Sequence, residues 1–130
     1  MTEKVLDARA LSELLLGGEL AHQVRALVSD RALHAPAHID AEVLALLQEK
    51  LSTDQVSEAQ VLRALQYLAS APITRHQLAP LAEGAWRRHD ELDVDDALYV
   101  ELAQALKIRL VSTNEELREI ELVDFVEAVQ

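Results

Sequence analysis

The order of hydrophobic and polar residues is clearest between residues 92 and 117, where a helix pattern runs directly into a strand pattern. Residues 93–96 contain three aspartates, which suit the positive end of a helix dipole. Apolar residues crowd 97–106 too densely for one narrow stripe, so a largely buried helix is predicted there. Residues 108–111 form a short β-branched run, and Ser-Thr-Asn at 112–114 ends it with turn and capping chemistry. This segment is predicted to be a helix lying against a sheet, followed by one strand of that sheet.

The rest of the chain alternates between strand and helix patterns. One strand is predicted to end at Asp7, and two others are predicted within 33–36 and within 72–74. An edge strand is predicted in 120–126, although Glu121 and Glu127 leave a helical ending open. Helices are predicted over 10–15 and 19–29, separated by Gly17 and Gly18, and over 39–51, 54–70 and 78–89. Ser-Thr-Asp at 52–54 is the predicted cap of the helix over 54–70. Four apolar residues of the helix over 78–89 are expected to face inward: Leu81, Ala82, Ala85 and Trp86.

This alternation predicts a three-layer α/β fold, with a mostly parallel sheet of four to five strands flanked by helices. At 130 residues the chain is long enough to bury a core, and one domain over 1–130 is expected.

Oxygen-bearing side chains are predicted to meet at the carboxyl edge of the sheet. A helix that precedes a parallel strand runs antiparallel to it, which places Asp96 near Asn114. Asp7 ends the first strand, and Glu42 lies in the first turn of a helix that follows a strand, so both belong to the same edge. Each acid alone is explained by capping or by the helix dipole, but their convergence indicates a site for magnesium or manganese, which prefer oxygen ligands.

The composition narrows the possible functions. A formal net charge of −11 argues against holding nucleic acid by simple phosphate attraction, so metal ions between carboxylates and phosphates would be needed. The charge also suits a basic protein partner. The absence of cysteine excludes disulfides, thiolate nucleophiles and cysteine-ligated zinc. The first ten residues lack the apolar core of a signal peptide, and no apolar run approaches a membrane span, so a cytoplasmic protein is expected.

Other conspicuous residues are given structural interpretations. Pro36 separates His34 from His38, which argues against a zinc site on one helix. Ordinary solvated side chains are expected for His22, His76 and His89 and for the basic pairs Arg75–His76 and Arg87–Arg88. Aromatic residues are scarce, and core positions rather than base-stacking platforms are expected for Trp86 and Tyr99. Gly17 and Gly18 match no phosphate-cradling motif.

The blocks VLDARALSELLL, HAPAHIDAEVLALL, APITRHQLAPLAEGAW, DDALYVELAQAL and IRLVSTNEEL resemble, in order, those of the PIN-domain ribonucleases, specifically the VapC toxins of toxin–antitoxin pairs. The resemblance implies a PIN-like fold and a Mg²⁺- or Mn²⁺-dependent endoribonuclease that hydrolyses RNA with metal-activated water and without a covalent protein nucleophile. It also implies a VapB-type antitoxin partner and a homodimer. Its catalytic acids carry over onto Asp7, Glu42 and Asp96, which with Asn114 would be the metal ligands.

Two positions depart from the family pattern. Asn114 stands where the family often has a fourth aspartate, so a second metal ion would be held more weakly. Arg9 stands where serine or threonine is common, and it would contact a phosphate or pair with the acids. These departures leave open an impaired PIN domain that serves mainly as an antitoxin-binding partner.

A receiver-like signalling module is disfavoured because no lysine follows the late strand that ends in Ser-Thr-Asn. The RNA target and the number of metal ions are not specified by the sequence.

Overall fold

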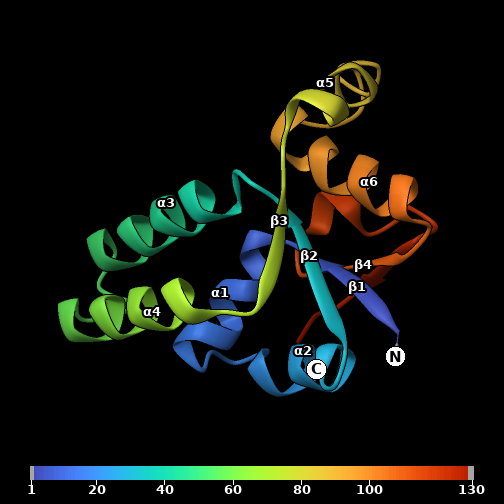
Figure 1. Cartoon of the computed structure of the whole chain (residues 1–130). Coiled ribbons are helices and arrows are strands. Elements are labelled where there is room, and N and C mark those ends of the chain that lie inside the picture. The colour runs from blue at the N-terminus through green and yellow to red at the C-terminus, as the bar shows by residue number, and fades with distance from the viewer. Residues whose placement is uncertain (1, 129–130) are drawn as a thin grey trace.

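A computed structural model describes residues 2–128 as an α/β fold with one five-stranded sheet (Figure 1). All four strand pairs are parallel, in the order β3-β2-β1-β4-β5. The strands are β1 (Glu3–Leu6), β2 (Ala32–Pro36), β3 (Ile73–His76), β4 (Arg109–Ser112) and β5 (Val123–Phe125). The helices are α1 (Ala8–Leu16), α2 (Ala21–Val28), α3 (Ile39–Ser52), α4 (Glu58–Ser70), α5 (Ala79–Trp86) and α6 (Val94–Leu106), with a short 3₁₀ turn, η1 (Glu115–Leu117). The predicted fold class is confirmed, and the edge strand in 120–126 is β5.

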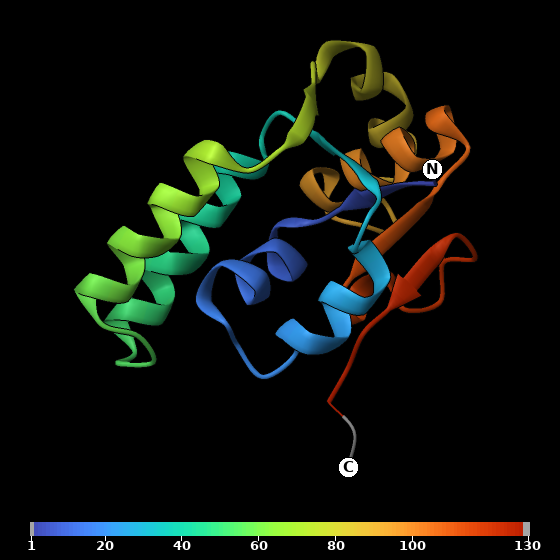
Figure 2. The same ribbon diagram turned by 60° about the horizontal axis from the view of Figure 1, so that its bottom comes forward.

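Helices cover both faces of the sheet. Helices α1 and α2 lie together on one side, whereas α5 packs on α6, which crosses β1, β2 and β4 on the other (Figure 1, Figure 2). Helices α3 and α4 form a pair that projects beyond the sheet in both views. The central strands are therefore buried on both faces, as Val5 and Leu6 of β1 and Leu110 and Val111 of β4 show.

The chain order creates a switch point between β1 and β4. From β1 the chain adds β2 and β3 on one side, and the crossover through α5 and α6 then returns it to the other side of β1. In open α/β sheets, ligands bind outside the carboxyl ends of the strands at such a point. Asp7 directly follows β1 and Asn114 lies two residues after β4, so both flank this position.

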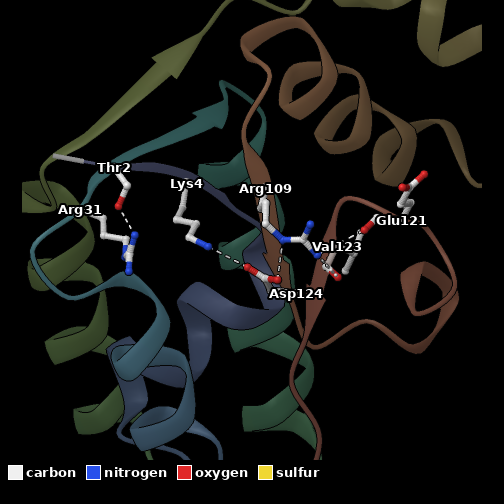
Figure 3. A network of polar contacts seen from close by, with 7 residues as sticks. All are labelled: Thr2, Lys4, Arg31, Arg109, Glu121, Val123 and Asp124. Carbon is white, nitrogen blue, oxygen red and sulfur yellow. Dashed lines mark hydrogen bonds and ion pairs between the residues drawn. The ribbon is translucent and has the colours of Figure 1, made fainter.

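The far strand β5 is fixed by charge as well as by backbone pairing. Asp124 accepts hydrogen bonds from Lys4 Nζ of β1 at 2.8 Å and from Arg109 Nε of β4 at 2.7 Å (Figure 3). Burial alone would raise the pKa of Asp124, but these two cations outweigh it and hold the pKa below its ordinary value. This network joins three neighbouring strands and sets the register of the edge.

Three expectations about individual helices were wrong in whole or in part. The cap of α4 is Ser57, which accepts from the Gln60 amide while the Gln60 side chain accepts from the Ser57 amide, and residues 52–54 instead end α3. This capping box was readable as Ser-x-x-Gln. In α5, Leu81 and Ala85 face inward as predicted, but Ala82 and Trp86 are exposed. The last turn of α6, with Ala105 and Leu106, is also exposed, whereas its middle is buried as expected.

No helix in the described part of the chain has the length and apolar character needed to cross a membrane.

Candidate metal site

A cavity of about 460 Å³ opens at the carboxyl edge of the sheet, where the first turns of α1, α3 and α6 meet the segment after β4. The four residues predicted from the sequence, Asp7, Glu42, Asp96 and Asn114, all line it. The structure therefore brings these four residues, which are distant in sequence, together around one cavity. The wall also carries Arg9, which was expected near the acids, and His38, Asp95 and Tyr99, which had not been grouped with the site.

Three carboxylates form the tightest group in this cavity. Glu42, Asp95 and Asp96 each contribute one oxygen, and these three oxygens lie within 4.8 Å of one another. Sequence reasoning had assigned Asp95 only to the acidic first turn of its helix. Three converging carboxylates with room for water match the donors that Mg²⁺ and Mn²⁺ prefer.

Burial and mutual repulsion perturb the titration of this group. Burial raises the pKa of Glu42 to about 7, and the hydrogen bond and charge of Asp95 and the charge of Asp96 act in the same direction. Burial also raises the pKa of Asp96, followed by the charge of Asp95, while a hydrogen bond from Asn114 opposes the rise. A nearby positive charge would offset both the burial of these carboxylates and their mutual repulsion, so the residues present fit a bound cation.

Two side chains hold Glu42 and Asp95 in place. Tyr99 is 1% exposed, as expected for a core residue, yet its hydroxyl donates to Glu42 Oε1 at 2.6 Å. His38 Nε2 donates to the Asp95 backbone carbonyl at 2.9 Å and lies 3.4 Å from Glu42 Oε1. The two rings also pack together, with centroids 4.9 Å apart. Nothing in the sequence pattern singled out this support, because it joins the start of α3 to the start of α6.

Asp7 lies in the wall of the same cavity but outside the three-carboxylate group. It is 4% exposed, and its Oδ1 accepts from the Ala10 amide at 2.8 Å as the N-cap of α1. Burial raises its pKa to about 6, against the opposing hydrogen bonds from Ser112 and Ala10. The charge of Asp96 raises it further. Asp7 therefore combines a capping role with a position beside the acidic group.

Asn114 and Arg9 complete the cavity. The Asn114 Oδ1 accepts from the Glu116 amide at 3.1 Å, and the Asn114 side chain also hydrogen-bonds Asp96. Since the carbonyl oxygen has one acceptor site already in use, Asn114 acts first as a support for Asp96. Arg9 is exposed and forms no ion pair with any described residue, but its charge opposes the rise in the pKa of Asp7 and of Asp96.

Several side chains expected to be solvated are engaged elsewhere. Arg75 forms a bidentate pair with Asp40, with both N–O distances 2.9 Å, and Arg88 pairs with Glu101 at 2.5 Å. His34 lies 2.9 Å from His76 across β2 and β3, and burial, followed by the charge of His34, lowers the pKa of His76. The expectation of free surface side chains was therefore wrong for Arg75, Arg88 and His76, because each has a partner from a distant element.

Comparison with known proteins places the chain in a family. The family model described as PIN domain matches residues 4–122. Ribonuclease VapC3 of Mycobacterium tuberculosis is 44% identical over 114 residues, which are 87% of this chain and 83% of that protein. Ribonuclease VapC12 of the same species is 31% identical over 108 residues, covering 83% and 84%.

Solved structures share the fold at lower sequence identity. The crystal structure of M. tuberculosis VapC20, described as a sarcin-ricin loop cleaving toxin, has a TM-score of 0.69 at 18% identity and covers 95% of this chain and 99% of that one. VapBC2 from Rickettsia felis, solved bound to a promoter DNA fragment, has a TM-score of 0.62 at 12% identity and covers 97% and 100%. The family model and the two ribonuclease relatives, more than the shared fold, show that the chain belongs to the PIN-domain family and, within it, to the VapC ribonucleases.

Proposed function

We propose that this protein is a divalent-metal-dependent endoribonuclease that acts as the toxin of a VapBC-type toxin–antitoxin pair. The observation that carries the proposal is the group formed by Glu42, Asp95 and Asp96 in a cavity at the switch point of the sheet. Relatives named as ribonucleases that align with most of the chain support the reaction class.

Glu42, Asp95 and Asp96 would hold Mg²⁺ or Mn²⁺, with Asp7 as the adjoining fourth acid. This set keeps the ligands expected from the sequence and adds Asp95. Asn114 would contribute mainly by holding Asp96, with its remaining carbonyl acceptor site available to the ion. A divalent cation in such a site supplies Lewis acidity toward a phosphoryl oxygen and lowers the pKa of coordinated water.

The chain's own groups position the substrate and handle protons. Arg9, exposed in the wall of the cavity, is placed to bind a phosphate oxygen of the RNA backbone. Glu42, with a pKa of about 7 in the metal-free protein, would release its proton when the cation binds. Tyr99 and His38 limit the movement of Glu42 and Asp95, since each donates a hydrogen bond to the group it supports.

A VapB-type antitoxin and a second copy of the chain are the proposed protein partners, and the cytoplasm is the proposed compartment. The net charge of −11 suits a basic antitoxin segment. A structure described as a toxin–antitoxin complex from Klebsiella pneumoniae shares the fold, with a TM-score of 0.59 at 15% identity.

The geometry does not favour the impaired, purely antitoxin-binding domain. Arg9 and Asn114 occupy the cavity as the sequence suggested, yet the three carboxylates stand together, and among residues 2–128 Arg9 forms no ion pair that would block them. Metal binding separates the two functions, because a nuclease requires it and a binding module does not.

The test is cleavage of mixed structured RNAs by the purified chain with Mg²⁺ or Mn²⁺, with EDTA, and by the Asp96→Asn variant. Asp30→Asn is the matched control, because Asp30 is exposed at the opposite edge of the sheet and its positive φ of 59° suits asparagine. Cleavage that requires both metal and Asp96, but not Asp30, is the expected result. A folded protein that neither cleaves RNA nor binds Mg²⁺ or Mn²⁺ by calorimetry would overturn the proposal.

A further inference from the structure

Trp86 is the largest side chain that the sequence pattern placed wrongly. It is the last residue of α5 and is 62% exposed, although tryptophan in a chain of this size normally finds cover. It is stacked on the imidazole of His89, with ring centroids 4.2 Å apart and an angle of 9° between the planes. The two stacked rings cover one face of each other, and their remaining exposed faces and edges form an aromatic surface, which we call the Trp86–His89 pair.

Hydrogen bonds hold this pair in place. His89 Nδ1 and the His89 backbone amide both donate to the Trp86 carbonyl, at 2.7 and 3.0 Å. Arg88, between the two rings in sequence, donates to Glu101 and Gln104 and thereby fixes the segment to α6. The aromatic surface is therefore ordered before any ligand arrives, so binding it would cost little side-chain entropy.

The pair adjoins the acidic site. His89 lines a second cavity, of about 310 Å³, together with Asp93 and Asp96, and these two aspartates also line the main cavity. Helix α5 packs against α6, which carries the carboxylates in its first turn (Figure 1). His89 of the pair thus borders a cavity that shares Asp93 and Asp96 with the main cavity, whereas Trp86 lines neither of the two.

The charges around the second cavity select what can bind there. Asp90, Glu91 and Glu116 line it as well, so a phosphate group would be repelled. A nucleobase is flat and uncharged, and every base has a π-face that stacks on aromatic rings. Arg9, by contrast, lies in the main cavity, where a phosphate would be favoured once a divalent cation offsets the charge of the carboxylates that line it. The distribution of charge therefore favours a base beside the second cavity and the RNA backbone in the main cavity.

We propose that the Trp86–His89 pair is a stacking platform for an unpaired nucleobase of single-stranded RNA next to the phosphate held at the acidic site. The inference rests on the proposed ribonuclease function and names a substrate-binding feature of the same site. It requires the RNA to be unpaired there, because a base within a duplex does not offer a free face. Stacking of one base on an aromatic side chain corresponds to a change in affinity of roughly 5- to 100-fold.

Kinetics of four proteins test the platform: the full wild-type chain, Trp86→Ala, Trp86→Phe and Tyr67→Ala. Tyr67 is the matched control, because it is 54% exposed on α4 and lines neither of the two cavities. Trp86→Ala is expected to raise KM for a single-stranded RNA by roughly 5- to 100-fold with little change in kcat, since stacking affects binding. Trp86→Phe should retain most of the affinity, and Tyr67→Ala should resemble wild type.

Fluorescence gives a second readout, because Trp86 is the sole tryptophan of the chain. Stopped-flow mixing with a mixed-sequence single-stranded RNA in Mg²⁺ should quench the emission, whereas an abasic strand of equal length should not. Quenching without any cleavage would support the platform and overturn the proposed nuclease. Asp96-dependent cleavage with an unchanged KM in Trp86→Ala and no quenching would overturn the platform and leave the nuclease standing. Emission that changes with protein concentration but not with RNA would also overturn the platform, since the surface would then bind a second copy.

Discussion

Replacing Asp7 with asparagine should make the metal-free protein more stable at pH 8 while weakening its metal site. The carboxylate is buried and caps α1 through the Ala10 amide. Asparagine has the same shape, is an equally good N-cap and still offers an oxygen to that amide. The substitution therefore removes a buried charge with little disturbance of packing.

The magnitude follows from the pKa of Asp7, which burial raises from 3.8 to about 6. Because the folded state binds the proton more tightly than the unfolded chain, protonation favours folding. That contribution is fully present below pH 3.8 and is lost as the pH rises through 6. A difference of about two pKa units corresponds to about 3 kcal/mol. Asparagine does not titrate, so the free energy of unfolding of Asp7→Asn should exceed that of wild type by about 3 kcal/mol at pH 8. This difference should disappear as the pH falls toward 4.

Urea unfolding followed by circular dichroism in EDTA, at pH 8, 6 and 4.5, measures this difference. Asp124→Asn is the matched control, because the same chemical change there removes a carboxylate whose pKa is held low by Lys4 and Arg109. It should lower the free energy of unfolding at pH 8, by about 1.5–3 kcal/mol for hydrogen bonds to charged groups. Added Mg²⁺ should stabilise wild type more than Asp7→Asn.

Two results would refute the reasoning. If Asp7→Asn were less stable than wild type at pH 8 in EDTA, the cap and the Ser112 hydrogen bond would outweigh the cost of burying the charge. If the difference between the two proteins did not depend on pH, the pKa of Asp7 would not be raised in the folded state.

Three further predictions concern the acidic group. Tyr99→Phe removes the hydroxyl that donates to Glu42 at 2.6 Å, so the pKa of Glu42 should rise above about 7. Calorimetry should then show weaker Mg²⁺ binding at pH 7 that recovers at pH 8.5, and equal loss at both pH values would argue against this role. Asn114→Asp places another carboxylate beside Asp96 and should lower the melting temperature in EDTA but tighten Mg²⁺ binding, as thermal shift with and without metal would reveal. Because Glu42 and Asp7 have pKa values of about 7 and about 6, Mg²⁺ binding at pH 6.5 should release protons. Calorimetry in two buffers of different ionisation enthalpy counts those protons, and the count should fall toward zero by pH 8.5.

The local pattern of hydrophobic and polar residues was sufficient to predict the helices and strands. It was also sufficient to predict the edge of the sheet at which the four predicted site residues meet. Strands and helices alternate along the chain, which leaves a parallel sheet as the compact solution, and the carboxyl ends of parallel strands share one edge. Asp7, Glu42, Asp96 and Asn114 each stand at such an end or at the start of a helix beside it. Their convergence is therefore a property of the topology and needs no side-chain detail.

Tertiary structure decided what each side chain does at that edge. Asp95 joins the group because α6 begins at Val94 and faces the start of α3. His38 at the start of α3 and Tyr99 of α6 then support the carboxylates. No spacing within one segment encodes a contact between two helices. Asp7 shows the same limit, since its hydrogen bonds with Ala10 and Ser112 set its orientation and keep it outside the three-carboxylate group.

Helix α5 shows why periodicity alone could not place Trp86. Leu81 and Ala85 form one apolar stripe, and Ala82 and Trp86, each one residue later, form a second stripe about 100° around the helix. Helix α5 packs mainly on a single neighbour, α6, which covers only the first stripe. The sequence by itself determined the elements and the acidic edge, because these depend on local periodicity and chain order. Only the tertiary structure decided which apolar and acidic side chains turn inward, because that depends on how many neighbours each helix has and where they lie.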